Sequence, residues 1–415
     1  PGASAEAREP MTSPSPSPAA ADDPNAGAAA SVDAVIVGGG IAGLWLHVLL
    51  RRRGYATVLL EADRLGCAQT LASQGMIHGG LKYALAGNLT GASEAIAGMP
   101  ERWRRCLDGD DDVDLSGVAP LSDRYYLFAE ASTLGRLTTF FASRTLRGRI
   151  ERLARPDHPE ALTAPGFKGV AYALQDFVLD TPALLARLRA AAPDGVYRCR
   201  VEADAVTLGQ NQVSVRTAAG TVSARHLILA AGAGTGPLLA RLGLAAPRMQ
   251  RRPLHQVLVR HPALGPLYAH CLTGIRRAEP RLTITALRDG DGWLWYLGGQ
   301  IAGDGVAMDA ETLTCHARAE LTACLPWIDW AKADIATLRI DRAEPAQDGG
   351  RRPDQAFAER HGACVVAWPT KLSLAPDLGD RVLALLPPPA GLRPRALSLP
   401  AAEVGTAPWA TGGPS

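Results

Sequence analysis

The clearest pattern of apolar and polar positions in the chain runs from residue 32 to residue 61. A continuous apolar run, Val35–Val37, is typical of a parallel strand that is covered on both faces. A glycine-rich turn follows, and then an apolar helix pattern that ends at three arginines, where positive charge is favourable. A second apolar run, residues 57–60, ends at Glu61. The pattern predicts a strand, a turn, a helix and a second strand.

The turn between this strand and this helix carries Gly38, Gly40 and Gly43 in the spacing G-x-G-x-x-G. The first glycine allows a tight turn, the second lets a pyrophosphate approach the backbone, and the third lets the helix lie close to the strand. The N–H groups at the helix N-terminus attract phosphates. Glu61 stands where a carboxylate accepts hydrogen bonds from a ribose diol. Because these features coincide, the unit is predicted to bind a dinucleotide.

The rest of the chain predicts helices, strands and one antiparallel meander. Helices are expected over residues 88–105, 134–153, 181–192 and 313–325, with a last helix that has Pro376 in its first turn and ends near Leu383. Strands are expected over residues 113–130, 254–259, 282–285, 293–297, 336–340 and 364–367. A three-stranded meander is expected over residues 196–208, 212–217 and 221 onward, followed by a buried strand at 226–230 and a second glycine turn at Gly232.

Composition narrows the function classes. The formal net charge of +2 over 415 residues gives no reason to expect nucleic acid as a partner. The seven cysteines are scattered and form no C-x-x-C, which favours free thiols in a reducing compartment over disulfides or a metal site. A membrane anchor is a competing interpretation of the first apolar stretch. Consecutive glycines, together with Asp33 and His47, argue against it, so no transmembrane segment is expected.

The two ends of the chain differ from its middle in composition. Residues 1–30 are rich in Pro, Ala and Ser and lack the basic start and apolar run of a secretory signal, so we expect a disordered segment. Met11 is a candidate native start, with the residues before it as an upstream extension. Residues 394–415 are also rich in Pro, Ala and Gly and are expected to form a loose tail.

The segment that follows Glu61 has the composition of a loop. Residues 66–80 are rich in small and polar side chains and come directly after the second strand, so this loop should run over the bound cofactor. The expected cofactor-binding residues of this loop and of two later segments are Thr70, Ser73, Gln74, Gly75, Val201 and Gly232. Cys67 is interpreted as a small core residue rather than as a redox or covalent-attachment residue.

Two short motifs resemble those of a known enzyme family. Residues 76–83, MIHGGLKY, are similar to the motif H-G-G-L-R-Y of flavin-linked glycerol-3-phosphate dehydrogenase, and residues 369–373, PTKLS, are similar to its segment G-G-K-L-T-T. With the glycine unit and the meander, the chain resembles FAD-dependent oxidoreductases of the D-amino-acid-oxidase type. Lys82 replaces an arginine of the first motif, and Pro369 replaces a glycine of the second. Residues 247–350 match this family in character only.

The resemblance implies an α/β fold. It consists of a Rossmann-like FAD-binding domain of the glutathione-reductase type and an interleaved, mostly antiparallel substrate domain. The expected boundaries are 31–109, 176–247 and 356–393 for the FAD-binding domain and 110–175 and 248–355 for the substrate domain. The resemblance also implies FAD as the cofactor, held non-covalently, with Lys371 and Leu372 in contact with it.

The motif residues receive roles from the resemblance and from their chemistry. His78 is predicted to accept the substrate proton, because the pKa of histidine lies near neutrality; a hydrogen bond within the turn is the alternative. Lys82 and Tyr83 are predicted to hold an anionic or polar end of the substrate, with solvation and packing as their respective alternatives. Lys371 is predicted to lie beside flavin N1 and to stabilise the reduced form.

Arg342 follows the strand pattern at 336–340 and is the candidate clamp for an anion, since an arginine binds carboxylate or phosphate through two parallel hydrogen bonds. Arg339 and Arg352 compete for this role. Together these residues predict oxidation of a small, polar, anionic substrate at a carbon that bears OH or NH, as in glycerol-3-phosphate or 2-hydroxy-acid dehydrogenases.

Other functions stay open at this point. An amino acid or amine C–N oxidase is the alternative enzyme, and a non-catalytic flavin-binding module is the alternative from another class. A nicotinamide-dependent reductase is disfavoured, because the chain has a single glycine-rich nucleotide motif near its N-terminus. The expected partners are a small-molecule substrate and an electron acceptor, which is a quinone, an electron carrier or O2. The expected location is cytoplasmic, with peripheral attachment to the inner face of the membrane as an alternative.

Overall fold

The structure, a computed structural model, describes residues 2, 29–80, 96–130, 150–274 and 279–410. Within these ranges the α-helices are α1 (Ile41–Arg52), α4 (Met99–Asp108), α6 (Thr181–Ala191), α7 (Thr235–Arg241), α8 (Gln300–Asp304), α9 (Ala310–Cys324) and α10 (Ala375–Leu385). None of these helices in the described part of the chain is long and apolar enough to cross a membrane.

The first sheet is built from three separate stretches of chain. Its strands are β1 (Ala30–Val37), β2 (Thr57–Glu61), β9 (Val196–Arg198), β10 (Val206–Leu208), β11 (Val213–Thr217), β12 (Gly220–Leu229), β18 (Phe357–His361) and β19 (Cys364–Trp368). Strand β1 lies between β2 and β12 and pairs with both in parallel, and β19 runs parallel to β12. The predicted unit of strand, helix and strand between residues 32 and 61 is therefore confirmed.

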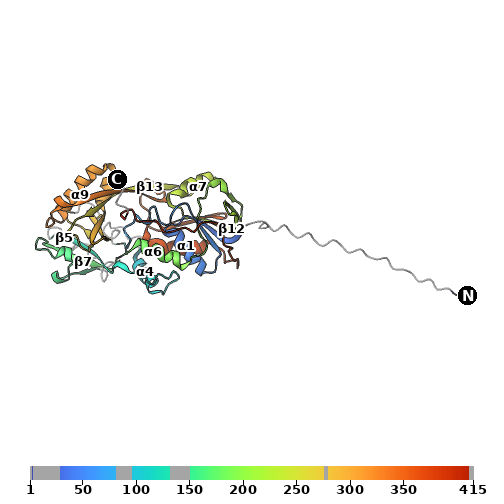
Figure 1. Ribbon diagram of the computed structural model, residues 1–415, viewed down its shortest axis with the longest axis horizontal. Coiled ribbons are helices and arrows are strands. Elements are labelled where there is room, and N and C mark those ends of the chain that lie inside the picture. The colour runs from blue at the N-terminus through green and yellow to red at the C-terminus, as the bar shows by residue number, and fades with distance from the viewer. Residues whose placement is uncertain (1, 3–28, 81–95, 131–149, 275–278, 411–415) are drawn as a thin grey trace.

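Both faces of β1 are buried, which explains its continuous apolar run. Successive side chains of a strand point to opposite faces. Ile36 accordingly packs in a cluster with residues of α1, α4, α6 and α10. Val35 and Val37 pack in a second cluster with residues of β11, β12 and α7. In Figure 1, α1, α6 and α7 gather in the same half of the molecule as β12.

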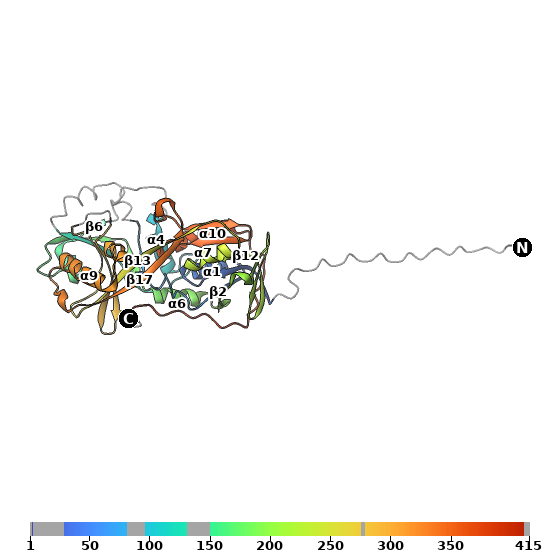
Figure 2. The same cartoon turned by 90° about the horizontal axis from the view of Figure 1, so that it is seen from above.

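The second sheet lies at the other end of the molecule, where Figure 1 shows β5, β7 and α9. Its strands, in spatial order, are β17 (Asp334–Pro345), β13 (Met249–Arg260), β16 (Gly292–Gly298), β15 (Leu282–Asp289), β14 (Tyr268–Cys271), β5 (Tyr125–Glu130), β7 (Gly169–Leu174) and β6 (Ile150–Arg152). All neighbours pair antiparallel except β14 and β5. Strands β13 and β17 pair along their whole length, and Figure 2 places them between the two halves of the molecule.

A small third sheet holds the strands β3 (Met76–Ile77), β8 (Phe177–Leu179) and β4 (Pro120–Ser122), in that order. It joins the loop after β2 to the segment that precedes α6. The boundaries of the two predicted domains stay predictions.

Several predicted elements differ from the observed ones. The expected first strand of the meander, residues 196–208, is two strands: β9 pairs with β2, and β10 pairs with β11. Of the residues 226–230, which were expected to form a separate strand, 226–229 are the end of the long strand β12. The helix predicted over 134–153 is wrong at its end, because residues 150–152 form β6, while residues 134–149 lie outside the described part. The strand predicted over 113–130 is confined to β4 and β5.

The C-terminal segment is not loose over residues 394–410. Leu397 and Ala402 are buried. The N–H of Leu65 donates to the carbonyl oxygen of Glu403 at 2.8 Å, and the N–H of Gly405 donates to that of Leu65 at 2.9 Å. Its composition disfavours helices and strands, but its carbonyl and N–H groups still pair with the loop after β2.

Candidate active site

The turn between β1 and α1 leaves no room for side chains at two of its glycines. Gly38 has a φ of 108°, and a Cβ there would lie 2.5 Å from the carbonyl oxygen of Ala230. A Cβ on Gly43 would lie 1.8 Å from the carbonyl oxygen of Gly38, so only glycine lets α1 pack this closely on the turn. Gly38 and Gly40 line a large cavity, whereas Gly43 is not part of its wall.

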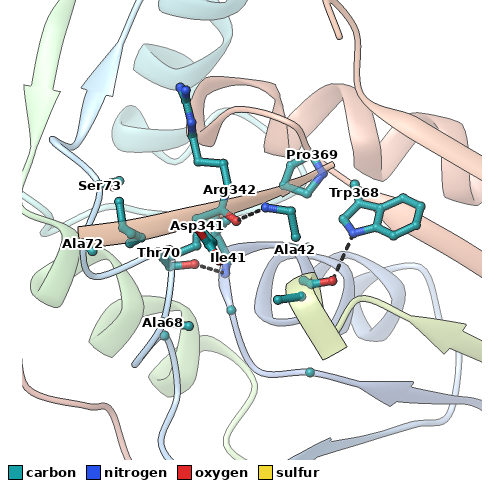
Figure 3. Close-up of a pocket in the computed structure, with 18 of the residues that line it drawn as sticks. Ile41, Ala42, Ala68, Thr70, Ala72, Ser73, Asp341, Arg342, Trp368 and Pro369 are labelled. Atoms are coloured by element: carbon teal, nitrogen blue, oxygen red, sulfur yellow. Dashed lines mark hydrogen bonds between the residues drawn. The ribbon is translucent and has the colours of Figure 1, made fainter. Parts of the chain in front are cut away.

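Two side chains hold the start of α1. Thr70 Oγ1 accepts a hydrogen bond from the N–H of Ile41 at 3.0 Å, which Figure 3 shows. Glu61 Oε2 accepts from the N–H of Gly39 at 2.5 Å, and Oε1 accepts from that of Asp63 at 3.0 Å. Because the first turn of a helix has N–H groups without intrahelical partners, these acceptors stabilise the turn. Thr70 and Glu61 both line the cavity.

The loop that follows Thr70 is tied to the second sheet. Gln74 Nε2 donates to the carbonyl oxygens of Thr283 at 3.0 Å and Tyr296 at 2.8 Å. Gly75 has a φ of 67°, and a Cβ there would lie 2.1 Å from the carbonyl oxygen of Leu179. Ser73, Gln74 and Gly75 all line the cavity. The side chain of Gln74 thus fixes the loop against β15 and β16.

The opposite wall of the cavity comes from the ends of β12 and β19. Trp368 Nε1 donates to the carbonyl oxygen of Gly232 at 3.2 Å, a contact that Figure 3 shows. Val201, Lys371 and Leu372 line the same cavity. Its volume is about 1110 Å³. This volume exceeds the about 300–1,000 Å³ of typical small-ligand sites, so the cavity has room for a dinucleotide and a small second molecule.

Lys371 is almost completely buried in this wall. Its Nζ donates to the carbonyl oxygens of Pro353 at 3.1 Å and Asp354 at 3.3 Å. Burial, and next the charge of Arg352, lower the pKa of Lys371 to about 7. The preceding Thr370 has a φ of 60°, a conformation that no other non-glycine residue of the described chain adopts. Backbone strain of this kind clusters at functional sites.

Three arginines form the wall on the side of β13 and β17: Arg252, Arg342 and Arg352. Arg252 lies opposite Arg342 in the ladder of these strands. It is paired with the buried Glu344, with Nε–Oε1 at 2.7 Å and Nη2–Oε2 at 3.2 Å. Burial, and then Arg352 and Arg252, lower the pKa of Arg342 to about 9, so Arg342 is cationic at pH 7. The buried Nε atoms of Arg342 and Arg352 have no hydrogen-bond partner among the described residues.

The predicted substrate residues fall into two groups. His78 and Arg342 line the same cavity as the glycine turn. In Figure 3 the side chain of Arg342 extends away from Ile41 and Thr70. Lys82 and Tyr83 lie outside the described residues.

The two competitors of Arg342 are also separated by the structure. Arg339 donates to the carbonyl oxygens of Val306 and Met308 and is not part of the cavity wall, whereas Arg352 is. Cys67 is exposed and lines the cavity, so its interpretation as a core residue is wrong.

Sequence reasoning missed the Arg252–Glu344 pair and Trp368. The burial of Glu344 could not be predicted, because a charged residue near a strand end is usually solvated. In the structure Glu344 is only 1% exposed. Arg252 follows a neighbouring arginine in the pattern, and only the register with β17 shows that it faces Arg342. A tryptophan that ends a buried strand directly before a predicted cofactor segment was the available signal for Trp368.

The fold and the site together define a dinucleotide-binding protein. A parallel core, a glycine turn at the N-terminus of α1 and an acidic residue at the end of β2 meet at one cavity. FAD fits these residues, because the turn admits a pyrophosphate and the cavity continues from Glu61 to Lys371 with room for a flavin. Among the described residues, no group of three or more His, Cys, Asp or Glu is placed to hold a metal ion.

Comparisons with known proteins give the family. A model of the FAD-dependent oxidoreductase family matches residues 33–344. The chain is 51% identical over 370 residues to a probable FAD-dependent oxidoreductase of Pseudomonas aeruginosa, over 88% of this chain and 93% of the relative. A crystal structure of an FAD-dependent oxidoreductase from the same species matches with a TM-score of 0.78 and 44% identity, over 92% of this chain and 98% of that chain. The aerobic glycerol-3-phosphate dehydrogenase of Escherichia coli is 40% identical over 65 residues, 16% of this chain and 13% of that enzyme.

The chain therefore belongs to the FAD-dependent oxidoreductases of the D-amino-acid-oxidase type. The predicted family, the α/β fold class with its Rossmann-like FAD-binding domain, the enzyme class and the cofactor are confirmed. The distant similarity to glycerol-3-phosphate dehydrogenase is confirmed as well.

Proposed function

We propose that the protein oxidises a small anionic substrate at a carbon that bears OH or NH. In this proposal Arg342 and Arg352 hold the anionic group, and His78 accepts the proton from oxygen or nitrogen. The observation that carries the proposal is the pair of buried guanidinium Nε atoms without hydrogen-bond partners in the cavity that His78 also lines. Lys82 and Tyr83 stay sequence predictions for the same end of the substrate.

The charges of the cavity wall support an anionic ligand. Glu344 pairs with Arg252 through two hydrogen bonds. The charges of Arg352 and Arg252 disfavour the cationic form of Arg342, and those of Glu344 and Glu279 favour it to a smaller extent. A buried charge is costly unless it is paired. A carboxylate or a phosphate in the cavity would add negative charge beside Arg342 and Arg352 and accept hydrogen bonds from both guanidinium groups.

The proposed roles of FAD, His78 and Lys371 follow from the chemistry of each group. FAD, when bound, supplies the two-electron oxidation. The chain's own task is to orient the substrate carbon and to remove the proton. A neutral imidazole at His78 is suited to this, because its ordinary pKa lies near the working pH. Lys371, with a pKa lowered to about 7, retains enough proton affinity to become cationic when negative charge develops beside it.

The test is anaerobic reduction of the bound flavin with a panel of 2-hydroxy acids, amino acids and polyol phosphates. The variants Arg342→Met and Arg352→Met should raise the KM for anionic substrates by about 10–100-fold, the loss of a charge-assisted hydrogen bond. Arg339→Met is the matched control, because Arg339 lies outside the cavity wall. His78→Ala should lower the rate of flavin reduction by about 10²–10⁴-fold.

The panel also separates the alternatives. An amino acid as the best substrate would make the protein a C–N oxidase, and a flavin that no compound reduces would indicate a binding module. An uncharged or cationic best substrate would contradict the anion clamp. A wild-type rate in His78→Ala across the accessible pH range would contradict the role of His78. Reoxidation of the reduced flavin by O2, a quinone or a protein electron carrier then identifies the acceptor.

A further inference from the structure

The small third sheet sets a buried carboxylate opposite His78. Strands β3 and β8 pair antiparallel, with Met76 opposite Val178 and Ile77 opposite Phe177. His78 directly follows β3 and Asp176 directly precedes β8, so the same register, continued by one residue beyond the strands, would set them opposite each other. Side chains of directly opposed residues project from the same face of an antiparallel pair, with Cβ atoms about 4.5–5.5 Å apart.

A hydrogen bond shows that the carboxylate reaches across to the strand of His78. Asp176 Oδ1 accepts from the N–H of Gly79, the residue after His78, at 2.9 Å. Asp176 is only 6% exposed, although a carboxylate is rarely buried without a structural or functional reason. His78 lines the cavity, whereas Asp176 is not part of the cavity wall.

The elements next to His78 and Asp176 carry other charged or titratable side chains, among them Arg104, Tyr125 and Lys371. On α4, the Arg104 guanidinium lies 4.5 Å from the ring centroid of Phe177 and donates to the carbonyl oxygen of Gln175. On β5, burial and to a smaller extent the charge of Asp176 raise the pKa of Tyr125 well above its ordinary value. Lys371 precedes the short 3-10 helix that packs on β3. Asp176 is the acidic group of this set that contacts the turn of His78.

We infer that Asp176 is the positioning residue of His78. It holds the turn through the amide of Gly79, and its negative charge favours the imidazolium that forms when His78 takes the substrate proton. This inference rests on the proposed function of His78 as proton acceptor. In the step, the hydride leaves the substrate carbon for FAD, and the proton of the OH or NH group goes to His78. The proton goes to His78 and not to the Asp176 carboxylate.

The experiment measures the pKa of His78 directly in the FAD-loaded protein. The chain is labelled with ¹³C-histidine, and the signal of His78 among the nine histidines is identified by its absence in His78→Gln. Asp176→Asn removes the charge and keeps the shape. It should lower the pKa of His78 by about one unit or more, the effect of losing an opposite charge within about 4–6 Å. Flavin reduction by the best substrate of the panel should slow by about 10–100-fold, a part of what a general base contributes.

Two further variants separate positioning from general damage to the sheet. Val178→Ala removes buried packing from β8, the strand that Asp176 precedes, without a change of charge. It should leave the pKa of His78 and the rate of flavin reduction at saturating substrate unchanged. Asp176→Glu keeps the charge but moves it by one methylene. It should keep the pKa of His78 near the wild-type value and lower the rate, because the contact with Gly79 is lost.

The outcomes distinguish this inference from the proposed function. If Asp176→Asn changes neither the pKa of His78 nor the rate, Asp176 has no role in positioning. Should Asp176→Asn fail to retain FAD, Asp176→Glu decides, and a wild-type rate in that variant overturns the inference. If His78→Gln itself reduces flavin at the wild-type rate, the proposed function of His78 fails. A pKa of His78 that still depends on Asp176 would then show only that the two side chains interact.

Discussion

Replacing Lys371 with methionine should stabilise the FAD-free protein, and most strongly at low pH. Burial lowers the pKa of Lys371 from 10.5 to about 7 in the folded state, while the unfolded chain keeps the ordinary value. Between these values the unfolded state binds more protons than the folded state, so wild-type stability rises with pH in this window. Below pH 7 the full cost of the buried ammonium is present. At 1.36 kcal/mol per pKa unit, this cost is about 4–5 kcal/mol at pH 6 and about 1 kcal/mol at pH 10.

The measurement is urea unfolding of the FAD-free wild type and of Lys371→Met at pH 6, 8 and 10. Methionine also removes the hydrogen bonds to Pro353 and Asp354, but this loss is common to all three pH values. The stabilisation by methionine should therefore be about 4 kcal/mol larger at pH 6 than at pH 10. The exposed Lys332, changed to methionine, controls for the loss of a lysine in general. A stability difference that is equal at pH 6 and pH 10 would refute the burial of a titrating amine at this position.

Three further predictions follow from the same cavity. Glu61→Gln should weaken FAD binding by about 1–3 kcal/mol, because the carboxylate predicted to accept hydrogen bonds from the ribose diol loses its charge. An unchanged dissociation constant would show that Glu61 serves only the backbone N–H groups of Gly39 and Asp63. Glu344→Gln should lower the free energy of unfolding by about 2–3 kcal/mol, because it leaves Arg252 without its ion-pair partner. The loss is smaller than for a fully buried ion pair, since the side chain of Arg252 is 26% exposed. Equal urea midpoints of the wild type and the variant would contradict this. Lys371→Met should also lower the reduction potential of the bound flavin, and an unaltered potential would place Lys371 away from the flavin ring.

Sequence reasoning succeeded where the physical requirement is local. Gly38 and Gly43 are glycines because a side chain at either position would meet a carbonyl oxygen a few residues away or on the adjacent strand. The G-x-G-x-x-G spacing records that requirement, so the turn and its neighbouring strands were predictable. Thr70 and Ser73 were found for a related reason, since a loop of small and polar residues directly after β2 must cross the end of the parallel strands.

Sequence reasoning failed where a role depends on the register between distant strands. Gln74 was expected to bind the cofactor, and it does line the cavity, but its amide donates to carbonyl oxygens of β15 and β16 more than 200 positions along the chain. Residues 196–198 have the pattern of a meander strand, yet they pair with β2 on the other side of β1. Neither the partner of Arg252 nor the opposition of Asp176 to His78 appears in any local pattern, because both follow from how strands align.

The site is assembled from all three sheets, and this has a consequence for how it responds to mutation. The first sheet supplies the glycine turn, the second supplies Arg342, and the third carries His78. Arg342, the proposed anion clamp, and His78, the proposed proton acceptor, therefore keep their separation only while the second and third sheets keep theirs. Gln74 is one of the residues that tie the cofactor loop to the second sheet, together with Gln69 and Ala72. A change at Gln74 should thus alter substrate binding and the rate of flavin reduction together, whereas changes at Arg342 or His78 should affect one more than the other.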